Sequence, residues 1–92
     1  MKENLSVESR IEISENYHWA KNAVGVVTQP PDYIVEMSDG WRGNIREVES
    51  LRGILSFYWV KFDEPQLDAD GDGPYHEAEI DSDYLNLLDE QE

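Results

Sequence analysis

Cysteine is absent from this sequence of 92 residues. Its absence excludes disulfide bonds, thiolate metal sites and a cysteine nucleophile, and makes the cytoplasm the expected location. The first twenty positions also lack an apolar run, because charged residues occur throughout them. The sequence therefore predicts neither a secretory signal nor a membrane span. We expect a single domain over residues 1–92, since a chain of this length holds one hydrophobic core.

Basic residues are scarce and confined to one part of the chain. Residues 1–62 hold all seven Lys and Arg with nine acids, residues 63–92 hold twelve acids and no Lys or Arg, and the formal net charge is −14. Such a charge repels nucleic-acid phosphate and anionic lipid, so neither is an expected partner, and it favours cations or a basic protein surface. The alternative is that the charge serves only solubility.

Histidine is scarce as well, and the sequence contains only His18 and His76. No serine, histidine and acid are spaced as a catalytic triad, and no second histidine is placed for a transition-metal site. We therefore expect a protein that is not an enzyme.

Alternation of apolar and polar residues, as in 7–13, and short runs of β-prone residues, as in 33–37, are both typical of β-strands. The expected strands are 7–13, 23–28, 33–37, 41–48, 55–62, 75–81 and a short one at 87–88, with a single turn at 82–85. The side chains expected to point inward from 55–62 and 75–81 are Tyr58, Val60, Phe62, Ala78 and Ile80. Two alternatives remain open: residues 47–51 could form one helical turn, and 87–88 a frayed helix. Residues 14–22 read as a loop pinned to the body by aromatic side chains.

This pattern predicts a mainly β fold, a small barrel of five or six antiparallel strands with a one-turn helix before the last strand. It covers about residues 7–88 and leaves an acidic tail at 89–92. It resembles the Src-homology-3-like barrels of the nitrile hydratase β subunit and the ferredoxin-thioredoxin reductase variable chain. The segments that carry the resemblance are 7–13, 19–20, 25–27, 58–63, 78–80 and 84–85. In those families the barrel is a structural or partner-docking piece, which implies an accessory subunit of a larger enzyme as one function.

Residues 68–79 match the twelve-position calcium-loop pattern. Calcium takes six to eight oxygen ligands, and alternating Asp residues let one turn of backbone aim several at one point. The candidate ligands are the carboxylates of Asp68, Asp70, Asp72 and Glu79 and the carbonyl of Pro74. In the EF-hand family two helices flank such a loop, whereas strands are expected here. The alternative is an acidic hairpin tip that needs no ion.

Aromatic residues are numerous for so small a domain, and three of them are tryptophans. If exposed beside acidic loops, they would suit a basic or proline-containing peptide through stacking and cation-π attraction. The candidate partner-binding residues are Trp19, Trp41, Trp59 and Tyr75. Burial is the favoured alternative for Trp41 and Trp59, since tryptophan is largely buried on average.

The leading functional hypothesis is a non-enzymatic interaction or adaptor module that presents an acidic, aromatic-bearing face to a basic protein. One version is an inhibitor or immunity protein that blocks a basic toxin or nuclease. The alternatives are a calcium-stabilised binding domain and the accessory subunit.

Overall fold

The computed structural model describes residues 7–88, and the predicted tail at 89–92 lies outside them. The described chain is mainly β, as the sequence predicted, but its sheet has seven strands and not the predicted five or six. In chain order the elements are β1 (Arg10–Ile13), β2 (Val24–Thr28), α1 (Asp32–Met37), β3 (Trp41–Arg42), β4 (Ile45–Ser50), β5 (Gly53–Gln66), β6 (Tyr75–Asp81), the 3-10 helix η1 (Ser82–Tyr84) and β7 (Leu85–Leu87). No helix in this range has the length and apolar character that crossing a membrane requires.

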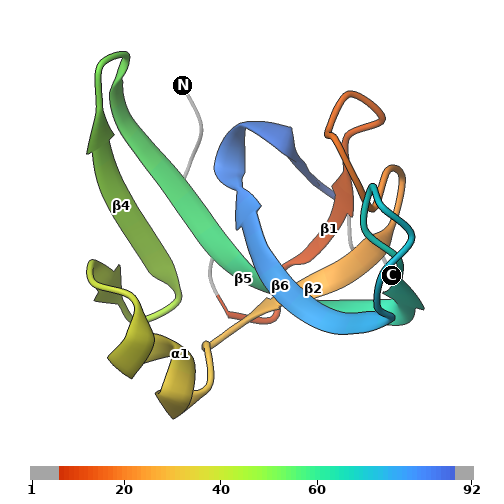
Figure 1. The fold of residues 1–92 in the computed structure, drawn as a ribbon, viewed down its shortest axis with the longest axis horizontal. Coiled ribbons are helices and arrows are strands. Elements are labelled where there is room, and N and C mark those ends of the chain that lie inside the picture. The colour runs from red at the N-terminus through yellow and green to blue at the C-terminus, as the bar shows by residue number, and fades with distance from the viewer. Residues whose placement is uncertain (1–6, 89–92) are drawn as a thin grey trace.

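The long strand β5 is the centre of the sheet (Figure 1). Its first part pairs with β4, its later part pairs with β2, and β6 runs along its other edge. The strand order is β3-β4-β5-β2-β1-β7 with β6 attached to β5, and every pairing is antiparallel. No pairing joins β6 to β7 within residues 7–88, so the described sheet is open there. The helix η1 forms the connection, which confirms the predicted turn before the last strand.

Residues 33–37, predicted as a strand, belong to the helix α1. The Pro31 carbonyl accepts hydrogen bonds from the N–H groups of Ile34 and Val35 at 3.0 and 3.2 Å, and the helix ends where Ser38 N–H donates to the Ile34 carbonyl. The prediction was wrong because a run of β-prone residues forms a strand only where a neighbouring strand supplies hydrogen-bond partners. A helical turn satisfies its backbone groups within the segment.

The hairpin of β4 and β5 differs from the sequence prediction at its turn. The helical alternative at 47–51 is wrong, because Ile45 to Ser50 pair with β5 and the hairpin closes with Ser50 opposite Gly53. Strand β5 also extends beyond 55–62 at both ends, so the acidic loop begins at Leu67. The first strand is shorter than predicted and begins at Arg10.

The main core lies on the inward face of β5 and its neighbours. The predicted inward residues Tyr58, Val60, Phe62 and Ile80 are buried, and Ala78 packs against them partly buried. The fully buried side chains are Ile11, Ile13, Val27, Val60 and Ile80. Burying each of these contributes about 1.5–3 kcal/mol before conformational entropy is subtracted.

Candidate functional site

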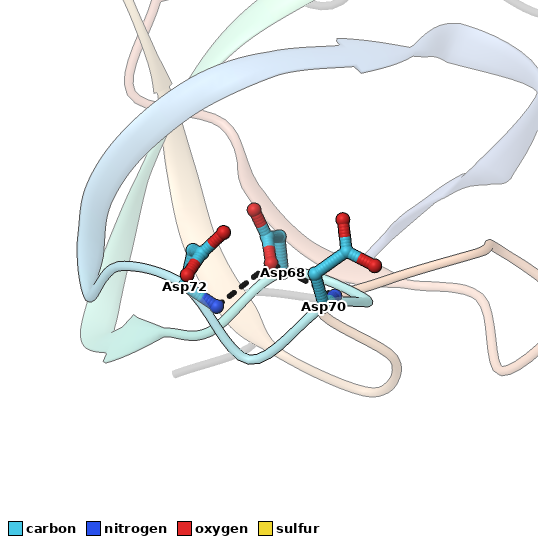
Figure 2. Close-up of side chains that lie close together, drawn as sticks. All are labelled: Asp68, Asp70 and Asp72. Carbon is cyan, nitrogen blue, oxygen red and sulfur yellow. Dashed lines mark hydrogen bonds between the residues drawn. The ribbon is translucent and has the colours of Figure 1, made fainter.

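Asp68 organises the loop between β5 and β6. Its Oδ1 atom accepts hydrogen bonds from the backbone N–H groups of Asp70 and Asp72, both at 2.9 Å (Figure 2). Its own N–H donates to the Asp72 carbonyl at 2.9 Å, and its carbonyl accepts from Gly71 N–H at 3.0 Å. Aspartate suits this position because its short side chain reaches the backbone of the residues that follow. Asp68 therefore braces the loop through hydrogen bonds to the backbone of residues 70–72.

The same contacts change the pKa of the Asp68 carboxyl group. N–H donors stabilise its charged form and lower its pKa, with the bond from Asp72 as the largest cause. The Tyr75 hydroxyl donates to Asp68 Oδ2 at 3.3 Å. The charge of Asp68 raises the pKa of Tyr75, so this tyrosine remains a protonated donor at neutral pH.

Three of the five predicted metal ligands come together in this loop. Carboxylate oxygens of Asp68, Asp70 and Asp72 all lie within 4.8 Å of one another, and Figure 2 shows the three side chains on the same side of the loop. Glu79 is engaged elsewhere, because its Oε2 atom pairs with Arg46 Nη1 at 2.6 Å. Pro74 lies at the exposed end of the loop. The group that could hold a hard cation is thus the aspartate triplet.

The loop that joins β1 to β2 is pinned to the core by buried side chains, and the aromatic anchor predicted within 14–22 is Tyr17. Tyr17, Ala20 and Ala23 are buried. The Tyr17 ring packs on Tyr84 with centroids 5.0 Å apart, and burial raises the pKa of its hydroxyl. With the loop anchored there, Trp19 is held beside the acidic loop.

A cleft of about 380 Å³ lies where these two loops meet. Its lining residues are His18, Trp19, Asp68, Ala69, Asp70, Tyr75 and Ala78. The rings of Trp19 and Tyr75 form one corner, with centroids 5.6 Å apart and planes at 75°. Trp19 also contacts the core ring of Phe62 at 5.8 Å, so the indole is supported from the inside. The cleft combines two predicted partner-binding aromatics with two predicted metal ligands.

The other two predicted partner-binding residues, Trp41 and Trp59, form a separate pair. Their ring centroids lie 6.2 Å apart. Trp59 is 6 % exposed, and its Nε1–H donates to Glu77 Oε1 at 2.7 Å. The predicted burial of Trp59 is confirmed. Trp41 is partly buried, with its Nε1 atom enclosed and unpaired among the described residues.

An ion pair borders the tryptophan pair on the outer face of the sheet. Arg46 donates to Glu79 and, through Nε, to the Asp39 carbonyl at 2.7 Å. It thereby ties β4 to β6 across β5. Trp41 and Trp59 therefore belong to a second packed cluster, and Trp19 and Tyr75 are the aromatic residues that line an open site.

Sequence reasoning missed His18 and the joining of the two loops. The sequence places His18 in the aromatic loop at 14–22. It does not show which other loop this loop contacts. The meeting depends on β2 and β6 flanking β5 from opposite edges, which is a tertiary feature. Comparisons with protein-family models, with curated proteins and with solved structures gave no match to this chain.

Proposed function

We propose that this protein is a non-enzymatic interaction module that binds a positively charged segment of another protein in the cleft between its aromatic and acidic loops. The observation that carries the proposal is the composition of the cleft. Trp19 and Tyr75 supply aromatic surface, and Asp68 and Asp70 supply negative charge. No lysine or arginine is among the described residues that line it.

The physical argument combines steering with local contact. A net charge of −14 attracts a basic partner from a distance and raises its association rate. At the cleft, cation-π attraction to an exposed aromatic ring adds about 0.5–1 kcal/mol. The same field repels phosphate and anionic lipid, so nucleic acid and membranes are not proposed as partners, and the proposed location is the cytoplasm.

The test uses a fluorescent decapeptide of alternating lysine and arginine and measures binding by anisotropy. We expect the double variant Asp70→Asn/Asp72→Asn to weaken binding several-fold. The control Glu47→Gln/Glu49→Gln removes the same charge from β4, away from the acidic loop (Figure 1), and should change affinity little. Equal weakening by the two double variants would mean that the peptide binds only through the net charge of the protein, and would contradict the proposal.

A second candidate function is calcium binding by the aspartate triplet, and its support is the approach of three carboxylates within 4.8 Å. Three carboxylates supply half of the smallest ligand set that calcium takes, so water or backbone oxygens must complete it. Calorimetric titration with calcium, with magnesium as control, should give one saturable site that Asp70→Asn/Asp72→Asn abolishes. Absence of heat from the native protein would remove this candidate.

We also propose that the fold is a Src-homology-3-like barrel. Its support is the continuous antiparallel order β6-β5-β2-β1-β7, the long loop at 14–23 and the helix η1 before the last strand. On this reading β3, β4 and α1 form an insertion between β2 and β5. An accessory subunit rests on the fold resemblance alone, and an inhibitor of a basic toxin or nuclease is one form of the leading proposal.

A further inference from the structure

We propose that the cleft selects arginine, so that the partner's key group is a guanidinium and not a lysine ammonium or a quaternary ammonium. This inference rests on the proposed function, because it names the side chain that the same cleft would accept. It follows from two features of the cleft, the shape of its aromatic corner and the one carboxylate that is left available.

The aromatic corner suits a flat cation. Trp19 meets both of its aromatic neighbours at steep angles, 75° with Tyr75 and 86° with Phe62. Neither neighbour is stacked parallel on the indole. A planar guanidinium that stacks on one wall of a near-perpendicular corner turns its N–H edge toward the other wall. Arginine uses both contacts, since it stacks on aromatic faces and directs N–H groups within its own plane.

The available acceptor in the cleft is Asp70. Asp68 already accepts two backbone N–H groups on Oδ1 and the Tyr75 hydroxyl on Oδ2, so it acts as a fixed charge. The exposed Asp70 side chain makes no hydrogen bond or ion pair within residues 7–88, and it lines the cleft. A free carboxylate beside an aromatic wall matches the two-pronged donor of a guanidinium.

Other cations use these groups less well. An ammonium group is compact and strongly hydrated, so it loses more water on entering and cannot donate two parallel bonds to one carboxylate. A trimethylated lysine has no N–H donor and would use the rings but not the Asp70 acceptor. Selectivity for arginine should therefore depend on Asp70, whereas the long-range attraction of cations depends on the net charge of the whole molecule.

The experiment compares four capped tripeptides that differ only in the central residue, which is arginine, lysine, trimethyl-lysine or citrulline, the neutral isostere of arginine. Each is titrated into the ¹⁵N-labelled protein in buffer with a calcium chelator, and the Trp19 indole and loop amide signals are followed. A single side chain should bind with a Kd of about 1 mM or weaker, which these signals can resolve. The Trp59 indole, which is hydrogen-bonded and buried, serves as an internal reference.

We expect the arginine peptide to bind about five-fold or more tightly than the lysine and trimethyl-lysine peptides, and the citrulline peptide not to bind. Asp70→Asn should remove most of the preference for arginine, whereas Glu49→Gln in β4 should leave it intact. If lysine or trimethyl-lysine binds the same residues as tightly as arginine, the inference is wrong and the proposed function stands. If no cationic peptide shifts the cleft signals, both are wrong.

Discussion

At the scale of single residues, Gly25 in β2 has no room for a side chain. A Cβ atom at this position would lie 2.5 Å from the Lys61 carbonyl oxygen, in the register where β2 crosses β5. Backbone atoms cannot move aside as a flexible side chain can. The absence of a side chain at Gly25 is therefore what lets β2 pack at this distance.

We predict that Gly25→Ala lowers the free energy of unfolding by about 2 kcal/mol or more, in the range for overpacked interiors. Urea denaturation followed by far-UV circular dichroism measures this. Gly43→Ala is the control, because Gly43 has φ +65° and no atom within 4 Å of the added Cβ, so it should lose only about 1 kcal/mol from backbone strain. An equal loss in both variants would contradict the steric explanation.

Asp68 and Tyr75 provide a second prediction at the residue scale, and it concerns pH. The pKa of Asp68 is lowered in the folded state, so its contribution is fully present above its unfolded pKa of about 3.9 and is lost as pH falls through the lower folded value. In Asp68→Asn this acid dependence should disappear. The pKa of Tyr75 should then move down toward its ordinary value, because the Asp68 charge is the main cause of its increase.

Carbon-detected NMR titration of the labelled aspartate and tyrosine side chains measures both pKa values. Asp83→Asn serves as the matched control, since Asp83 is exposed in η1 and makes no side-chain contact with Tyr75. A Tyr75 pKa that is unchanged in Asp68→Asn would show that the two groups do not interact in solution.

At the scale of elements, α1 and β5 are held by different forces. Helix α1 has no buried residue, and Tyr33, Val35 and Met37 are among its exposed side chains. Six residues are too few for a helix to be stable alone in water. Strand β5, in contrast, has partners on both edges and carries Tyr58, Val60 and Phe62 into the core.

We therefore predict that the amide hydrogens of α1 exchange with solvent by local opening, whereas those of residues 58–62 in β5 exchange only on global unfolding. Native-state hydrogen exchange by NMR over a range of urea concentrations distinguishes the two. The free energy of opening in α1 should be independent of urea, and the values in β5 should converge on the global one. Equal protection in both elements would mean that α1 is packed more firmly than its exposure indicates.

At the scale of the whole molecule, the dominant property is the excess of negative charge. Two ion pairs join described elements, the exposed pair of Arg10 with Asp63 and the half-buried pair of Arg46 with Glu79. Exposed pairs contribute little to stability, and the sequence holds 21 acids but only seven Lys and Arg. In the folded chain, repulsion among the carboxylates should therefore outweigh the attraction within the ion pairs, and salt screens both.

We predict that raising the sodium chloride concentration from about 0.05 M to about 0.5 M increases the Tm. Thermal unfolding by circular dichroism at constant pH measures this. Choline chloride in place of sodium chloride controls for specific binding of sodium to the aspartate triplet. A Tm that falls with salt would mean that ion pairs outweigh repulsion.

Features of this protein that depend on local pattern could be predicted from the amino-acid sequence. The alternation in 55–62 and 75–81 was enough to predict which side chains face the core, because side chains in a strand alternate between two faces. The density of Asp and Gly predicted a polar loop at 63–74, and the structure confirms its part at 67–74, since residues 63–66 belong to β5. The turn before the last strand was also visible in the local sequence.

Which segments of the chain lie side by side depends on the tertiary structure. Residues 33–37 carry a strand-like pattern, yet they form α1, since pairing partners are not encoded locally. Glu79 fits the calcium-loop spacing, but Arg46 comes from β4 to pair with it. Trp41 and Trp59 are packed together, whereas Trp19 and Tyr75 line the open cleft. The two pairs differ because β5 has different neighbouring elements on its two edges and its two faces. Such neighbours are set by pairings between distant parts of the chain, which spacing along the sequence does not record.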